Sequence, residues 1–131
     1  MNYGFIKVAS AVPLVRVADC IYNISQIEEL VAQAEGKGVE VIVFPELSVT
    51  GYTCQELLLD AAETGVMQLI DFTRQLDIIT IIGAPVPVGD LLLNCAVVVQ
   101  QGRILGIVPK TYLPNYSEFY EKRWFASSQD L

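Results

Sequence analysis

The sequence contains no histidine, and this absence narrows the chemistry that the chain can perform. Neither a Ser-His-Asp triad nor a Cys-His pair can be assembled from its residues. A side chain that transfers protons here must therefore be a carboxylate, a lysine or a tyrosine.

Charge is also scarce. Only 18% of the residues are charged and 53% are hydrophobic, whereas an average soluble domain has roughly 25% charged residues. The net charge of −7 argues against a protein that follows a phosphate backbone, so we expect no nucleic-acid partner. A 131-residue chain is at most one ordinary domain. A chain with so many apolar residues needs apolar cover on more than one face. Either its own residues bury the sheet on both sides, or residues outside 1–131 provide part of the cover.

Cysteine is sparse, and the three cysteines are far apart, at Cys20, Cys54 and Cys95. Their spacing fits neither a disulfide framework nor a zinc site. We expect small buried residues, with a reactive thiolate as the alternative at Cys54, which opens an expected helix. No apolar run approaches the roughly 18 residues of a spanning helix, and no signal-peptide pattern is visible. These features predict a cytoplasmic protein without membrane contact.

The pattern of apolar residues predicts an α/β fold with a mixed sheet. Residues 4–12 are expected to form a strand, and Asp19 is expected to cap a helix that ends near Glu35. Residues 39–44 form the next expected strand, which gives a parallel, right-handed β-α-β unit. Two helical stretches follow, at residues 56–62 and 66–76, and then a strand at residues 78–82.

The second half of the chain changes character. Residues 83–87 (GAPVP) predict a rigid exit from the strand. Strands are expected at residues 91–99 and 104–108, joined by a hairpin turn in which Gly102 supplies the positive φ. From Thr111 onward no periodicity is present, and aromatic residues crowd what we expect to be a loop.

Two of the expected strands end in the same way, with a proline followed by an ionisable residue: Pro45-Glu46 and Pro109-Lys110. If both strands lie in one sheet and run in the same direction, Glu46 and Lys110 meet at one edge and form an acid–base site. The alternative is that they are two unrelated charges on the rim of the sheet. Spacing alone leaves both interpretations open.

Residues 44–52 have the sequence FPELSVTGY and resemble the glutamate motif of the nitrilase-like carbon–nitrogen hydrolases. Residues 107–110 (IVPK) resemble the lysine motif of that family. Two further segments, GYTCQEL at 51–57 and KTYLPNYSEFYEKRWF at 110–125, are similar to the glutaminase domain of the glutamine-dependent NAD synthetases.

The resemblance implies a fold and a set of site residues. Residues 1–131 would form the N-terminal portion of the glutaminase domain, the first half of a nitrilase-type α-β-β-α sandwich. Glu46 would be the general base, Lys110 would stabilise the tetrahedral intermediate, Glu118 would orient Lys110, and Tyr116 would lie near the glutamine substrate. In the family the nucleophilic cysteine follows the lysine motif by many residues. It would therefore lie outside residues 1–131, and this chain alone is expected to be inactive.

The implied reaction is the release of ammonia from glutamine through a cysteinyl thioester. The ammonia would be used for ATP-dependent amidation of deamido-NAD. No cofactor is expected in this domain, because ATP and Mg²⁺ would bind in a separate synthetase domain, and the chain has no P-loop. The implied partners are glutamine, the rest of the parent chain and a second copy of the amidase domain. Two alternatives remain: a free-standing amidase acting on another small amide, and a non-catalytic fragment or interaction module.

Overall fold

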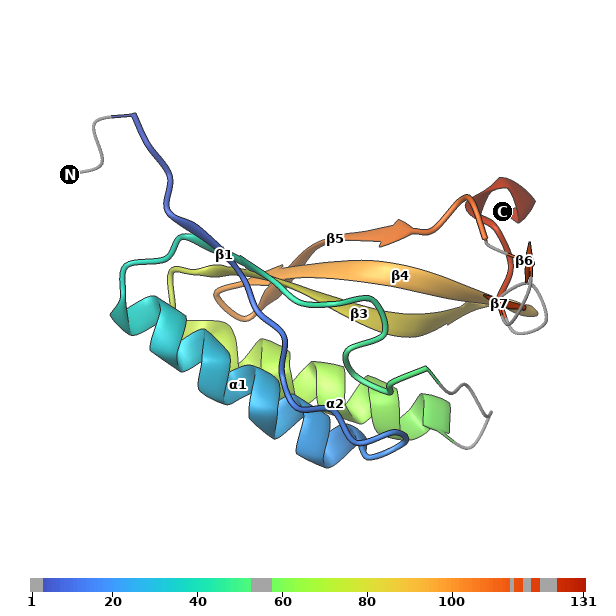
Figure 1. Cartoon of the computed structure of the whole chain (residues 1–131), viewed down its shortest axis with the longest axis horizontal. Helices are drawn as coiled ribbons and strands as arrows, with labels where there is room; N and C mark the ends of the chain where they lie inside the picture. Colours follow the sequence, from blue (N-terminus) through green and yellow to red (C-terminus); the bar gives the residue numbers. More distant parts are fainter. Residues whose placement is uncertain (1–3, 53–57, 114, 117–118, 121–124) are drawn as a thin grey trace.

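The computed structural model describes residues 4–52, 58–113, 115–116, 119–120 and 125–131 (Figure 1). The elements in chain order are β1 (Val8–Ser10), α1 (Cys20–Gly36), β2 (Val41–Val43), α2 (Leu59–Phe72), η2 (Thr73–Gln75), β3 (Ile79–Val88), β4 (Leu91–Gln100), β5 (Arg103–Pro109), β6 (Asn115–Tyr116), β7 (Phe119–Tyr120) and η4 (Ser128–Asp130). Within this part of the chain, no helix is long and apolar enough to cross a membrane.

The main sheet has five strands in the order β1-β2-β3-β4-β5. The first three strands are parallel, whereas β4 is antiparallel to both β3 and β5. The predicted α/β fold with a mixed sheet and a parallel β-α-β unit is therefore confirmed. Since β5 is antiparallel to β4, it runs in the same direction as β2, and both strands end at the same edge of the sheet.

Helices α1 and α2 lie together on one side of this sheet (Figure 1). Asp19 caps α1 as predicted, because its carboxylate accepts the Tyr22 N–H at 3.0 Å. The buried apolar residues of α1 are spaced three and four apart, as a core-facing helix requires. The opposite side of the sheet, which we term the open face, carries the exposed apolar side chains Val8, Val43 and Val108.

The prediction of two helical stretches after residue 55 is wrong for the described residues, because α2 is continuous from Leu59 to Phe72. Gly65, which lies between the two predicted stretches, is inside the helix. A Cβ on Gly65 would lie 2.8 Å from Cγ1 of Ile24 in α1. The glycine is therefore needed for close packing of the two helices, which outweighs its poor helix propensity.

The predicted exit at residues 83–87 is also wrong, since β3 continues through both prolines to Val88. The backbone of Gly83 faces away from β4, because its N–H and C=O bond to Ser48 and Val49. Pro85 and Pro87 have the same alternation, so their nitrogens also face away from β4. β2 ends at Val43, opposite Ile81, so no β2 residue pairs with β3 at Pro85 or Pro87. The missing N–H groups of the two prolines therefore break no hydrogen bond of the sheet. Strands β1 and β2 are shorter than predicted.

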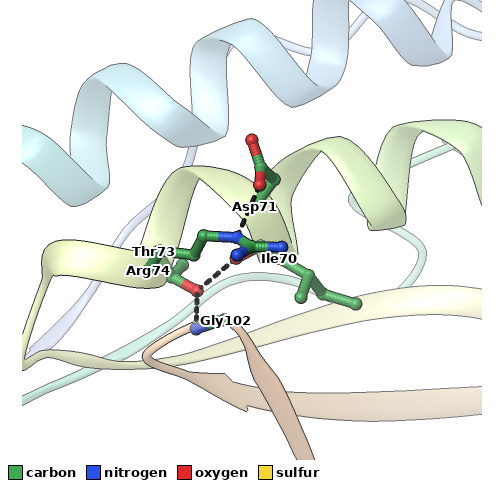
Figure 2. Close-up of polar contacts among 5 residues, drawn as sticks. All are labelled: Ile70, Asp71, Thr73, Arg74 and Gly102. Carbon is green, nitrogen blue, oxygen red and sulfur yellow. Dashed lines mark hydrogen bonds and ion pairs between the residues drawn. The ribbon is translucent and has the colours of Figure 1, made fainter.

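The hairpin between β4 and β5 forms as predicted, with Gln101 and Gly102 both at positive φ. Figure 2 shows how the turn is fixed to the end of α2: the Thr73 hydroxyl accepts the Gly102 N–H at 3.1 Å and donates to the Ile70 carbonyl at 2.7 Å. Beyond Lys110, the expected loop contains the short antiparallel pair of β6 and β7, which accords with the strand propensity of its aromatic residues.

Candidate active site

Residues 45–47, which follow β2, lie on the open face over Gly83 of β3, and Ser48 and Val49 then return to the side of β3 that faces away from β4. We term residues 45–47 the crossing. A Cβ built on Gly83 would lie 2.3 Å from the Leu47 nitrogen and 2.7 Å from the Pro45 oxygen. These distances are far inside van der Waals contact, so only glycine permits the crossing. The crossing directs the side chain of Glu46 from the end of β2 toward Lys110 at the end of β5.

Three hydrogen bonds hold this segment against the sheet and α1. The Gly83 N–H donates to the Ser48 hydroxyl at 3.1 Å, and the Val49 N–H donates to the Gly83 carbonyl at 3.1 Å. The fully buried Asn23 donates to the Val49 carbonyl at 2.9 Å. Leu47 has a φ of 52°, which a branched residue adopts only when its surroundings impose it. The residue next to Glu46 is therefore rigidly placed.

Lys110 comes directly after β5, and its backbone is held on both sides. Its N–H donates to the Asn94 carbonyl at 2.8 Å, which continues the pairing of β4 with β5. Its carbonyl accepts the Ser128 N–H at 3.0 Å. The hydroxyl of Ser127 donates to the Thr111 carbonyl at 2.6 Å. The chain after residue 125 thus returns to fix the backbone from which the lysine side chain extends.

Glu46 and Lys110 meet, as the first of the two sequence interpretations requires. Lys110 Nζ lies 2.7 Å from Glu46 Oε1, and the hydroxyl of Tyr52 donates to Glu46 Oε2 at 3.2 Å. The side chains of Lys110 and Glu46 are 28% and 33% exposed. At this partial burial, each charge lowers the desolvation penalty of the other. The interpretation as two unrelated rim charges is therefore wrong.

The ion pair lies in a cleft of about 340 Å³ on the open face. The cleft is lined by residues of four strands and the loop after β2: Val43, Phe44, Pro45, Glu46, Ile81, Ile82, Gly83, Asn94, Cys95, Ala96, Val108, Pro109 and Lys110. Such a site offers a proton acceptor and a fixed cation within a mostly apolar wall, which strengthens electrostatic interactions. In the ranges that the structure describes, no group of three or more His, Cys, Asp or Glu could hold a metal ion.

The other residues singled out from the sequence either lie outside the described residues or are buried cysteines. Tyr116 ends β6, but its side chain, Glu118 and Cys54 lie outside the described residues, so their predicted roles stay predictions. Cys20 and Cys95 are buried free cysteines, as expected. Burial raises the pKa of the Cys95 thiol to about 11. Burial, together with the nearby Asp19 carboxylate, also raises the pKa of the Cys20 thiol.

The sequence interpretation missed several residues that build the site. Gly83 was assigned to a rigid exit, although a glycine inside an apolar strand is a signal of close backbone approach. Tyr52 belongs to the quoted glutamate motif, but its hydrogen bond to Glu46 was not expected. Nothing in the local pattern of Ser127 and Ser128 indicates that they pair with Lys110 and Thr111, because those contacts depend on how the chain returns to the sheet.

A family model described as carbon-nitrogen hydrolase matches residues 7–130. The chain therefore belongs to the carbon–nitrogen hydrolase family, and the predicted family membership is confirmed. It is 37% identical, over 98% of its length, to the glutamine-dependent NAD(+) synthetase of Mycobacterium leprae (strain TN). The chain spans only 20% of that relative.

Solved structures agree with this membership. The chain matches a glutamine-dependent NAD(+) synthetase from Cytophaga hutchinsonii with a TM-score of 0.86 and 26% identity, over 93% of this chain and 22% of that one. An amidase from Nesterenkonia sp. shares the fold, with a TM-score of 0.78 and 23% identity over 94% of this chain and 48% of the amidase. The predicted nitrilase-type fold is confirmed.

Proposed function

We propose that this chain supplies the general base and the lysine of a glutaminase site in a glutamine-dependent NAD synthetase. The observation that carries the proposal is the 2.7 Å ion pair between Glu46 and Lys110 in the cleft. The identity to the mycobacterial synthetase supports glutamine, rather than another amide, as the substrate.

In the proposed reaction, Glu46 takes the proton of a cysteine thiol, which attacks the carboxamide carbon of glutamine. Lys110 stabilises the negative charge that develops on the carbonyl oxygen. The intermediate expels ammonia, to which Glu46 returns the proton, and leaves a thioester. Water, deprotonated by Glu46, then releases glutamate and the thiol. Glu118 would orient Lys110, and Tyr116 would contact glutamine.

We further propose that the nucleophile comes from outside residues 1–131. Cys20 and Cys95 are 3% exposed each, and the raised pKa of each thiol disfavours the nucleophilic thiolate. ATP and Mg²⁺ would act in a synthetase domain that is likewise outside these residues. There, the ammonia would amidate deamido-NAD.

The test is to compare glutamine and ammonia as nitrogen donors in the full-length enzyme. Glu46→Gln removes the base but preserves the size of the side chain. It should lower glutamine-dependent NAD formation by about 10²- to 10⁴-fold, while ammonia-dependent NAD formation continues. Loss of both activities would indicate misfolding. Hydrolysis of acetamide or propionamide in preference to glutamine would instead support a free-standing amidase.

A further inference from the structure

Asn94 lines the cleft, but neither the sequence analysis nor the proposed reaction assigns a role to it. It lies in β4 opposite Pro85 of β3, and its carbonyl accepts the Lys110 N–H. Strand alternation places its side chain on the open face, beside that of Lys110. The residue is 2% exposed and lines the cleft together with Glu46.

The side-chain nitrogen of Asn94 has no hydrogen-bond partner among the described residues. Glu46 also lines the cleft, but its carboxylate accepts from Lys110 at Oε1 and from Tyr52 at Oε2, and not from Asn94. The other walls, including Val43 and Val108, offer apolar side chains. A buried amide without an acceptor destabilises a fold, so a leucine of similar size would be the more stable choice here.

We propose that Asn94 Nδ2 donates a hydrogen bond to a carbonyl oxygen that enters the cleft beside Lys110 in the complete glutaminase site. The inference rests on the proposed function. The acceptor is a neutral carbonyl, because a second anion beside the Glu46 carboxylate would be repelled. Two sources have this chemistry: the carboxamide of glutamine, and a backbone carbonyl of the segment that carries the nucleophile.

Thr80 provides an internal comparison. Its hydroxyl oxygen also has no partner among the described residues, and the residue is 0% exposed. Thr80, however, lies opposite Val99 on the side of the sheet that α1 and α2 cover, away from the cleft. A buried hydroxyl in the helix-facing core has no route to a ligand. The unpaired amide of Asn94 therefore lines the cleft, whereas the unpaired hydroxyl of Thr80 lies in the core between the sheet and the helices.

The experiment uses the full-length enzyme with Asn94→Leu, Asn94→Ala and the control Thr80→Val. Both Asn94 variants lack the N–H donor and add no charge beside Glu46. Leucine approximates the size of asparagine, and alanine preserves the test if the leucine variant does not fold. We expect kcat/KM for glutamate release from glutamine to fall at least about tenfold in both Asn94 variants. Thr80→Val should retain the wild-type value and an equal or higher unfolding temperature.

The rate of inactivation by methyl methanethiosulfonate, a thiol reagent without a carbonyl group, identifies the source of the carbonyl. If glutamine supplies the oxygen, kcat or KM changes while modification of the nucleophile proceeds at the wild-type rate. If the backbone supplies it, this modification slows as well, because the nucleophile is displaced. Wild-type kcat and KM in Asn94→Leu or Asn94→Ala would overturn the inference. A wild-type enzyme that releases no glutamate, or Glu46→Gln that still does, would overturn the proposed function itself.

Discussion

The amide nitrogen of Leu47 lies 2.3 Å from the point where a Cβ on Gly83 would stand. This close approach sets the position of the Glu46 carboxylate, because Glu46 precedes Leu47 in the segment that passes over Gly83 of β3. The crossing also brings the side chain 2.7 Å from Lys110, two strands away from the end of β2. The ion pair therefore requires that position 83 of β3 is occupied by glycine, which has no side chain.

Gly83→Ala should displace the crossing segment and separate Glu46 from Lys110. We expect glutaminase activity of the full-length enzyme to fall at least about tenfold and the free energy of unfolding to fall by about 1–3 kcal/mol. Steady-state kinetics and urea unfolding measure the two effects. Gly106→Ala is the matched control, since nothing lies within 4 Å of a Cβ at that position in β5. Wild-type behaviour of Gly83→Ala would contradict the role of the crossing.

In the proposed reaction Lys110 is the cation that stabilises the developing oxyanion, so Lys110→Ala should abolish most glutamine use. We expect kcat to fall by about 10²- to 10³-fold, with ammonia-dependent synthesis retained. Lys110→Met, which preserves the length of the side chain, should lose as much activity and so separates charge from packing. If the methionine variant stays active, the lysine acts through packing and not through its charge.

The sequence predicts the features that depend on local periodicity. The first helix, its Asp19 cap, the hairpin turn at Gly102 and the apolar strands follow from residue spacing and turn chemistry. The meeting of Glu46 and Lys110 was one of two open interpretations, because strand order is not encoded in the spacing of two motifs. The family resemblance supplied their roles, and those roles stay predictions.

What the sequence does not reveal depends on contacts between distant elements. Residues 63–65 fall outside both predicted helical stretches, yet Gly65 lies inside α2 and allows the close approach of Ile24 from α1. Pro85 and Pro87 suggest that the strand ends, yet both nitrogens face the side that needs no donor. Asn94 is one residue in an apolar strand, and only the pairing with β5 places it beside Lys110.

Cys95 should behave as a buried residue and not as a nucleophile. Burial raises the pKa of its thiol from 9.0 to about 11, so the folded protein keeps the proton to higher pH than the unfolded chain. Stability should therefore fall as the pH rises above about 9, on the order of 1 kcal/mol per pH unit until about 11. Cys95→Ala should remove this component of the pH dependence and retain glutaminase activity. Urea unfolding between pH 7 and 11 tests the first point, and loss of glutamine turnover in folded Cys95→Ala would contradict the second.

Residues 1–131 produced alone should self-associate and release no glutamate from glutamine. The open face exposes Val8 (66%), Val43 (41%) and Val108 (60%) to water, and apolar side chains gathered on one sheet face favour association. Light scattering after size-exclusion chromatography measures the association. Val108→Lys should weaken it, whereas Met67→Lys, at a 57% exposed position of α2, should not. A monomeric chain would show that the open face needs no cover. Glutamine turnover that disappears in Cys54→Ala would assign the nucleophile to this chain.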